Sequence, residues 1–406
     1  MMRYRGWWLG VSLALCVGNA GAVSFGTFDP RAMAMGGTGV ADAAPGTASY
    51  YNPALLATAR KSDDFSLEFP VVGITLADPD NLRDSLNNFQ NNDNTQKFSD
   101  AINAFQSNPS QANADTAASA GQALLSDLQA LSEKAAQFDA NAGLAIAVPS
   151  TRLGVAVIVN ARALGGMLLD VTPSDVAAIQ TALTKIQNLD PTVTDPTQNL
   201  TSAVLGTGAI LEEVGVSLAR NFDVTGTKVA FGITPKVVRA DTFDYKLDVN
   251  TASVSLGQGR KSQTSFNLDL GTAVQLGAGL KAGMVIKNVI PKDYTTALNN
   301  VIKSKPQARA GITYQNKWTT LAMDIDLTKN DPTGLDAPTQ FIALGAEFDA
   351  LGWAQLRAGY RYNMKNSNTS AASLGVGVSP FGVHIDLAAV AGNNLLGVGL
   401  QAGYRF

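Results

Sequence analysis

The chain has 406 residues, of which 46% are hydrophobic and only 16% are charged, and its formal net charge is −3. This charged fraction lies below the roughly 25% of an average soluble domain, and the charge balance gives no electrostatic case for nucleic-acid binding. One Cys and one His exclude a disulfide scaffold and a His-cluster metal site. After the N-terminus, no apolar run approaches the roughly 18–20 residues that a membrane-spanning helix needs.

The first 22 residues have the three parts of a secretory signal peptide. Two arginines form a positive n-region, residues 7–17 form a short apolar h-region, and residues 20–22 form an A-x-A cleavage site. We expect cleavage after Ala22, which leaves a mature chain without cysteine because Cys16 lies in the signal. Lipid attachment at Cys16 is disfavoured, since a leucine and not a small residue precedes it.

Residues 23–60 show no regular alternation and are rich in small residues, which suits close packing where bulky side chains have no room. Their glycines lack a preceding strand and a following Gly-Lys-Ser/Thr, so a phosphate-binding loop is a poor interpretation. The residues singled out in this segment are Arg31, Gly36, Gly37, Gly39, Asn52 and Pro53.

Residues 61–406 alternate in many segments between apolar residues and small or polar ones. In the last segment, Leu396, Leu400, Tyr404 and Phe406 share one face, opposite glycines and polar residues. We count about 14 such strands, joined by connections of which every second one is tight and most of the others are longer. This pattern is typical of an antiparallel transmembrane β-barrel of the outer membrane, with both termini in the periplasm. A soluble β-sandwich with helical insertions is the alternative, because its strands also alternate.

Two long connections, residues 78–139 and residues 170–200, have helical patterns instead. In the first, Leu124, Leu128 and Leu131 recur at helical spacing, and the second has a similar spacing of apolar residues. The parity of the connections places both inserts outside the cell. Either they fold over the barrel mouth and bury their apolar faces on each other, or they form a cap that binds a partner.

Charged residues on the polar faces of the strands are expected to face the lumen, because a Lys or Arg facing lipid near mid-bilayer costs about 2–4 kcal/mol. This lumen-facing set is Asp269, Lys281, Lys287, Arg309, Asp324, Asp326, Glu347, Arg357, Arg361, His384 and Asp386. Both signs occur, so we expect pairing across a narrow lumen or with the N-terminal segment, where Arg31 is a candidate partner for an acid. The alternative is a polar path for solutes.

His384 and Asp386 are the one pair with catalytic potential, since a His–Asp pair can act as a general base. Residues two apart on a strand lie nearly 7 Å apart, estimated from the rise per residue, which is poor for direct pairing. No Gly-x-Ser-x-Gly motif accompanies them, so we expect a hydrogen-bonding network and no catalytic residue. Residues 331–336 have the acids of a calcium loop but are better interpreted as a turn, so we expect neither a metal nor a cofactor.

The stretch R-A-x-x-x-G-G-x-G-V-A from Arg31, followed by Y-Y-N-P-A, a barrel and a terminal aromatic residue, resembles the FadL-like superfamily of outer-membrane barrels. Within it, the chain looks most like the TraF-type barrels named for plasmid transfer operons. The resemblance implies that residues 23–60 are a hatch that plugs the lumen from the periplasmic side. It also implies that Tyr404 and Phe406 belong to the signal read by the barrel-assembly machinery. The chain departs from fatty-acid transporters because charges replace a continuous apolar path.

Together these observations predict a non-enzymatic barrel in the outer membrane of a Gram-negative bacterium. The resemblance implies a TraF-type role linked to plasmid transfer or envelope interactions. The expected partners are outer-membrane lipid, the barrel-assembly machinery, and envelope or conjugation proteins. The alternative is a FadL-like channel for small solutes, hydrophobic ones included, with Pro70 and Pro235 as candidate kinks in its wall. A membrane-embedded hydrolase would require His384 to meet a catalytic group from another strand.

Overall fold

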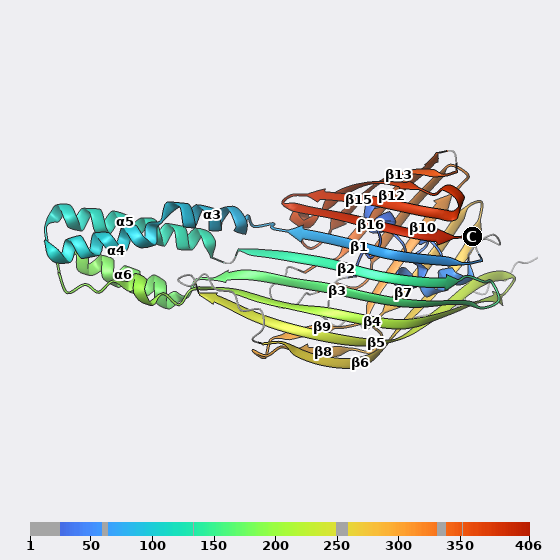
Figure 1. The fold of residues 1–406 in the computed structure, drawn as a ribbon, viewed down its shortest axis with the longest axis horizontal. Helices are drawn as coiled ribbons and strands as arrows, with labels where there is room; N and C mark the ends of the chain where they lie inside the picture. The colour runs from blue at the N-terminus through green and yellow to red at the C-terminus, as the bar shows by residue number, and fades with distance from the viewer. Residues whose placement is uncertain (1–24, 59–63, 133, 249–258, 331–337, 351) are drawn as a thin grey trace, which may run out of the picture.

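The computed structural model describes residues 25–58, 64–132, 134–248, 259–330, 338–350 and 352–406. Fourteen antiparallel strands close into a barrel in which β1 (Ser66–Ala77) pairs with both β2 and β16. Neighbours along the wall follow the order of the chain, apart from a separate two-stranded sheet, β8–β9 (Figure 1). The expected barrel is thus confirmed and the soluble sandwich is wrong. The predicted signal peptide, with its cleavage at Ala22, lies outside the described residues.

The strands of the wall differ strongly in length. β4 and β5 each have 22 residues, whereas β7, β11 and β14 each have 8. The long strands run toward the end of the barrel that carries the helices, and the C-terminus lies at the opposite end (Figure 1). The remaining wall strands are β2 (Ala135–Val148), β3 (Gly154–Asp170), β4 (Ala203–Val224), β5 (Thr227–Asp248), β6 (Lys261–Gly277), β7 (Leu280–Lys287), β10 (Gln307–Gln315), β11 (Thr319–Asp326), β12 (Phe341–Ala350), β13 (Ala354–Asn363), β14 (Ala371–Val378), β15 (Val383–Gly392) and β16 (Leu395–Arg405).

Apolar side chains of the wall face outward and polar ones face the lumen. On β15, Val383, Ile385 and Leu387 are exposed, whereas His384 and Asp386 are buried. This arrangement is the inverse of a soluble barrel and is typical of transmembrane β-barrels, whose outer face is apolar and whose lumen is polar.

The two candidate kinks have different outcomes. At Pro70 the pairing register of β1 shifts between Glu68 and Val71 against both neighbouring strands. Pro235 keeps its pairing with Leu268 of β6, and the register of β5 against its neighbours does not shift. The barrel is closed at both places. Pro70 is therefore the site of a bulge in a continuous wall.

Residues 25–58, which we call the lumenal segment, lie inside the barrel. The segment contains α1 (Pro30–Ala34), α2 (Ala48–Tyr51) and the short helix η1 (Pro53–Ala57). α1 contacts β1 and β13 to β16, whereas η1 contacts β3 to β6 on the opposite side. Because it touches both sides, the segment spans the lumen (Figure 1).

The two helical inserts form one bundle. Apolar residues of both inserts, among them Phe98, Phe105, Leu124 and Ile179, are fully buried together. The bundle extends away from the barrel instead of closing its mouth (Figure 1), and its inserts connect β1 to β2 and β3 to β4. Within the described ranges, no helix is long and apolar enough to cross a membrane. The helices are α3 (Leu82–Asn92), α4 (Asn94–Ser107), α5 (Gln111–Leu131) and α6 (Pro173–Gln187).

Asp175 fixes the start of α6 to the start of the next wall strand. The backbone N–H of Thr201 donates to Asp175 Oδ2 at 2.9 Å, and the hydroxyl of Ser202 donates to the same oxygen at 2.5 Å. Burial alone would raise the pKa of Asp175, but these hydrogen bonds outweigh burial and hold the pKa below its usual value.

The connection between β7 and β10 folds into the lumen, which the sequence analysis did not foresee. Its hairpin, β8 (Lys292–Thr295) and β9 (Val301–Ser304), packs Tyr294 and Ile302 against buried apolar residues of β3, β4 and β5. The Tyr294 hydroxyl lies 2.8 Å from the Ser265 hydroxyl of β6. The hairpin therefore covers the inner face of the long strands β3, β4 and β5.

Candidate functional site

The wall presents glycines to the lumenal segment at many of the places where the two meet. A Cβ atom at Gly359 would overlap the backbone nitrogen of Gly36, and one at Gly232 would overlap that of Ala54. The segment therefore sits directly on the backbone of the wall. We call this set the glycine ring; it consists of Gly73, Gly143, Gly154, Gly232, Gly271, Gly283, Gly345, Gly359, Gly375 and Gly399.

The glycines of the segment itself are held by polar groups of the wall. Gly36 and Gly37 have φ angles of +71° and +94°, a conformation that L side chains rarely adopt. The N–H of Gly36 donates to the Ser373 hydroxyl at 3.0 Å, and the N–H of Gly39 donates to Asp324 Oδ2 at 2.9 Å. Asp324 thus binds the segment through a backbone donor.

Asn52 and Pro53 join the second half of the segment to the wall. The Asn52 amide donates to the carbonyl of Val40 at 2.9 Å and to that of Thr272 in β6 at 3.0 Å. Its side-chain oxygen accepts from the Ala54 N–H, which caps η1, and Pro53 occupies the first position of that helix.

Arg31 lies at the centre of a chain of buried charges that we call the anchor network. Its Nε donates to Glu347 Oε2 at 2.9 Å, and its Nη2 lies 3.2 Å from Asp42 Oδ2. Glu347 also accepts from Arg357 Nε at 2.6 Å, and Arg357 Nη1 donates to Asp386 at 2.6 Å. Buried pairs of this kind need good geometry to offset desolvation, and removing one partner leaves an uncompensated charge. The network therefore fixes the segment to β12, β13 and β15.

His384 contacts a residue that the sequence analysis missed. Its Nε2 lies 2.7 Å from Glu68 Oε2, whereas Asp386 is 3.9 Å away. The Ser66 hydroxyl donates to the other oxygen of Glu68 at 2.7 Å, so the acid lies between the serine and the histidine. A catalytic triad needs the histidine between the other two groups. This arrangement is therefore a hydrogen-bonding network of β1 and β15.

Most other predicted lumen charges have partners inside the barrel. Arg309 Nε donates to Asp326 at 2.6 Å, and Lys287 Nζ donates to the carbonyl of Tyr50 at 2.9 Å. Asp269 lies 3.1 Å from Lys236, a buried lysine that we had not singled out. Alternation could have indicated Lys236, since it shares a face with other inward residues of β5.

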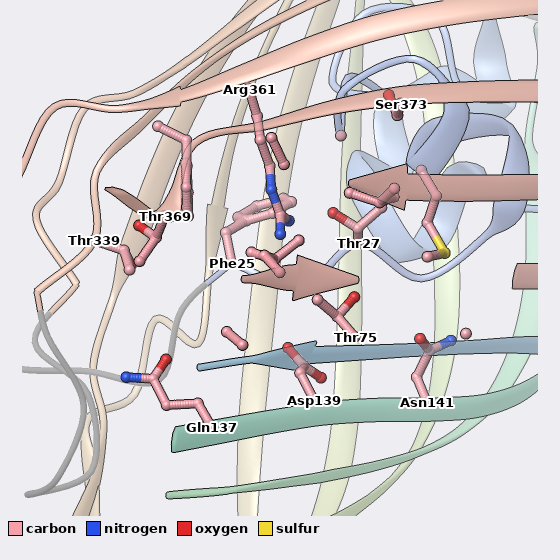
Figure 2. Close-up of a pocket in the computed structure, with 18 of the residues that line it drawn as sticks. Phe25, Thr27, Thr75, Gln137, Asp139, Asn141, Thr339, Arg361, Thr369 and Ser373 are labelled. Atoms are coloured by element: carbon pink, nitrogen blue, oxygen red, sulfur yellow. The ribbon is translucent and has the colours of Figure 1, made fainter. Parts of the chain in front are cut away.

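Two cavities lie on opposite sides of the lumenal segment. The outer cavity, about 140 Å³, opens toward the helical end and is lined by Thr27, Met33 and Arg361 among others (Figure 2). The inner cavity, about 340 Å³, lies at the end with the tight turns and is lined by Arg31 and Lys281 among others. Met33 and Arg31 both belong to α1, so this helix, together with the rest of the lumenal segment, lies between the two cavities.

The remaining predicted residues lie at the C-terminus. Tyr404 and Phe406 are exposed, and the Phe406 ring lies 5.4 Å from that of Phe65 and 5.6 Å from that of Tyr404. In the part of the chain that the structure describes, no group of three or more His, Cys, Asp or Glu side chains is placed to hold a metal ion.

A family model described as "F plasmid transfer operon, TraF, protein" matches residues 49–326. No curated protein matches the chain. Among solved structures, a TodX deltaS2S3 mutant monoaromatic hydrocarbon channel is 12% identical and has a TM-score of 0.53, covering 93% of this chain and 98% of its own. The CymD monoaromatic hydrocarbon channel is 12% identical, with a TM-score of 0.51 and coverages of 93% and 97%. The toluene transporter TodX of Pseudomonas putida is 12% identical, with a TM-score of 0.50 and coverages of 95% and 97%.

Proposed function

From the premise that this chain belongs to the TraF family of the F plasmid transfer operon, we propose that it is a gated channel of the outer membrane for small solutes. The observation that carries the proposal is the placement of α1, which contributes Met33 to the outer cavity and Arg31 to the inner one. We infer that the two cavities join when α1 shifts together with the neighbouring residues of the lumenal segment. In this proposal the helical bundle faces the medium, the tight turns face the periplasm, and the lumenal segment acts as the hatch.

The charges of the lumen favour polar solutes over hydrocarbons. The similar solved structures carry titles that describe hydrocarbon channels, which supports transport as a use of this fold. Here, however, the inner cavity is lined by Asp42, Lys281, Glu347, His384 and Arg405. An apolar solute would displace water from these charged groups without offering them hydrogen bonds, which is unfavourable. A polar solute can replace that water and form hydrogen bonds with the groups.

A second candidate is a surface role in plasmid transfer or envelope contact, which the description of the family favours. The observation behind it is the helical bundle, which extends beyond the barrel toward the proposed outside of the cell (Figure 1). Under this candidate, conjugation or envelope proteins bind the bundle. In either case we propose that lipid covers the outer wall and that the barrel-assembly machinery reads Tyr404 and Phe406.

Single-channel conductance of the full mature protein in planar bilayers tests the channel proposal. Arg31→Met removes the links from Arg31 to Glu347 and Asp42. Glu347 stays paired with Arg357, and Asp42 keeps the attraction of Lys281, so the barrel is expected to fold. The matched control is Arg152→Met, which changes an exposed arginine in the tight turn between β2 and β3.

We expect rare openings for the wild-type protein and for Arg152→Met, and much more frequent openings for Arg31→Met. Folding is checked by heat-modifiable mobility. If neither the wild-type protein nor Arg31→Met conducts while both are folded, the channel proposal fails. Replacing residues 82–131 by a short linker then tests the surface role, which predicts a lower frequency of plasmid transfer.

A further inference from the structure

The outer cavity contains a guanidinium, that of Arg361, that forms no ion pair with a carboxylate of the described residues. Arg361 extends from β13 into the cavity, and its Nε is buried without a hydrogen-bond partner (Figure 2). Its one contact of note is with the ring of Phe341, whose centroid lies 5.4 Å from Cζ. A buried guanidinium nitrogen without an acceptor is costly, so an absent acceptor near Nε is the natural explanation for this arrangement.

The other charges around the cavity are already satisfied. Asp139 is the one carboxylate among the described residues that line it, and Arg162 occupies both of its oxygens. Arg162 Nε donates to Oδ1 at 2.9 Å, and Nη2 donates to Oδ2 at 2.5 Å. Among the described residues that line the cavity, two guanidinium groups thus accompany one carboxylate, which is an excess of one positive charge. Its ligand should carry one negative charge.

The size and lining of the cavity indicate the rest of the ligand. A volume of about 140 Å³ is close to that of an engineered cavity of roughly 150 Å³ that binds benzene. Phe25, Phe138, Leu164 and Phe341 supply an apolar lining of the cavity, and Phe341 lies beside Arg361. One aromatic ring fits this space, and a guanidinium binds a carboxylate through two parallel hydrogen bonds.

We propose that the outer cavity binds a monocyclic aromatic carboxylate, with the carboxylate on Arg361 and the ring against the phenylalanines. Hydroxyls of Thr339, Thr369 and Ser373 line the same space and can donate to the carboxylate or to water. As an entry site for a transported solute this cavity rests on the proposed channel function. As a binding site it does not, because the cavity lies entirely on the outer side of α1.

Binding of 4-fluorobenzoate to the full mature protein in detergent, followed by ¹⁹F NMR titration, tests the proposal. The neutral amide 4-fluorobenzamide is the matched ligand, since it has the same ring and nearly the same shape. Arg361→Met removes the charge, Arg361→Lys keeps the charge without the planar fork, and Arg152→Met is the control in an exposed turn.

For the wild-type protein and Arg152→Met, we expect the benzoate to bind at least tenfold more tightly than the amide. Arg361→Met should abolish this preference, and Arg361→Lys should reduce it. If Arg361→Met does not fold, the affinities of Arg361→Lys for the two ligands test the proposal instead. Equal affinity for the two ligands, or an unchanged preference in either Arg361 variant, would overturn the proposal. If benzoate binding depends on Arg361 but Arg31→Met does not conduct, the binding site is supported and the channel proposal fails. If Arg31→Met conducts but benzoate binding does not depend on Arg361, the channel proposal is supported and the binding site fails.

Discussion

Replacing Glu347 with Gln should destabilise the folded protein by about 3 kcal/mol. Glu347 accepts two hydrogen bonds from Arg31, at 2.9 and 3.1 Å, and one from Arg357 at 2.6 Å. Removing one partner of a buried ion pair costs about 3–5 kcal/mol. The lower end applies here, because Arg31 keeps Asp42 and Arg357 keeps Asp386 as partners.

A double-mutant cycle measures the interaction between Arg31 and Glu347 directly. Glu347→Gln, Arg31→Met and the double variant are unfolded in urea in lipid vesicles, with tryptophan fluorescence as the signal. Residues in one buried network couple by about 0.5–3 kcal/mol, and the upper half of this range is expected for a bidentate pair. The control is Glu212→Gln. The partner of Glu212, Arg239, is 4.0 Å away and both side chains are 49% exposed, so this substitution should cost less than about 1 kcal/mol. Additive effects of the two substitutions, or a Glu347→Gln cost equal to that of the control, would refute this account of the anchor network.

Three further predictions concern other parts of the molecule. Gly359→Ala places a methyl group against the backbone of the lumenal segment and should cost about 1–3 kcal/mol, whereas Ala358→Val on the outward face should cost little; urea unfolding compares the two. Phe105→Ala should lower the stability of the helical bundle by about 3–5 kcal/mol without changing the heat-modifiable mobility of the barrel. Circular dichroism at 222 nm follows the melting of the helices, and a melting temperature equal to that of the wild-type protein would contradict this prediction. Asp175 has a lowered pKa in the folded state, so its ionised form stabilises the bundle above the unfolded pKa of about 3.9, and this contribution is lost as the pH falls through the folded value. Asp175→Asn should therefore melt earlier than the wild-type protein at pH 7 and no differently at a pH below the folded pKa; an equal difference at both pH values would count against the hydrogen bonds at this residue.

The barrel could be predicted because each wall strand meets two different environments. On β15, apolar Val383, Ile385 and Leu387 alternate with His384 and Asp386, and this alternation is visible in the sequence alone. The β8–β9 hairpin could not be predicted in the same way. Its strands have four residues each, and packing against distant strands, not a local pattern, turns it inward.

The lumen-facing side chains could be predicted, but their pairing could not. Alternation places Arg357 and Arg361 on the same face of β13, yet Arg357 joins two carboxylates and Arg361 has no carboxylate partner among the described residues. The difference depends on which strands and which part of the lumenal segment lie opposite. Glu68 was missed for a related reason, since the bulge at Pro70 shifts the register of β1.

The glycine ring makes the sequence of the wall and that of the lumenal segment interdependent. Gly399 faces the Met33 side chain, so a larger residue there can be compensated by a shorter one at position 33. Gly359 faces the backbone of Gly36, where no smaller residue exists to compensate. Among members of the family, we therefore expect the wall position opposite Met33 to vary together with the segment, and the position opposite Gly36 to stay glycine wherever the segment is retained.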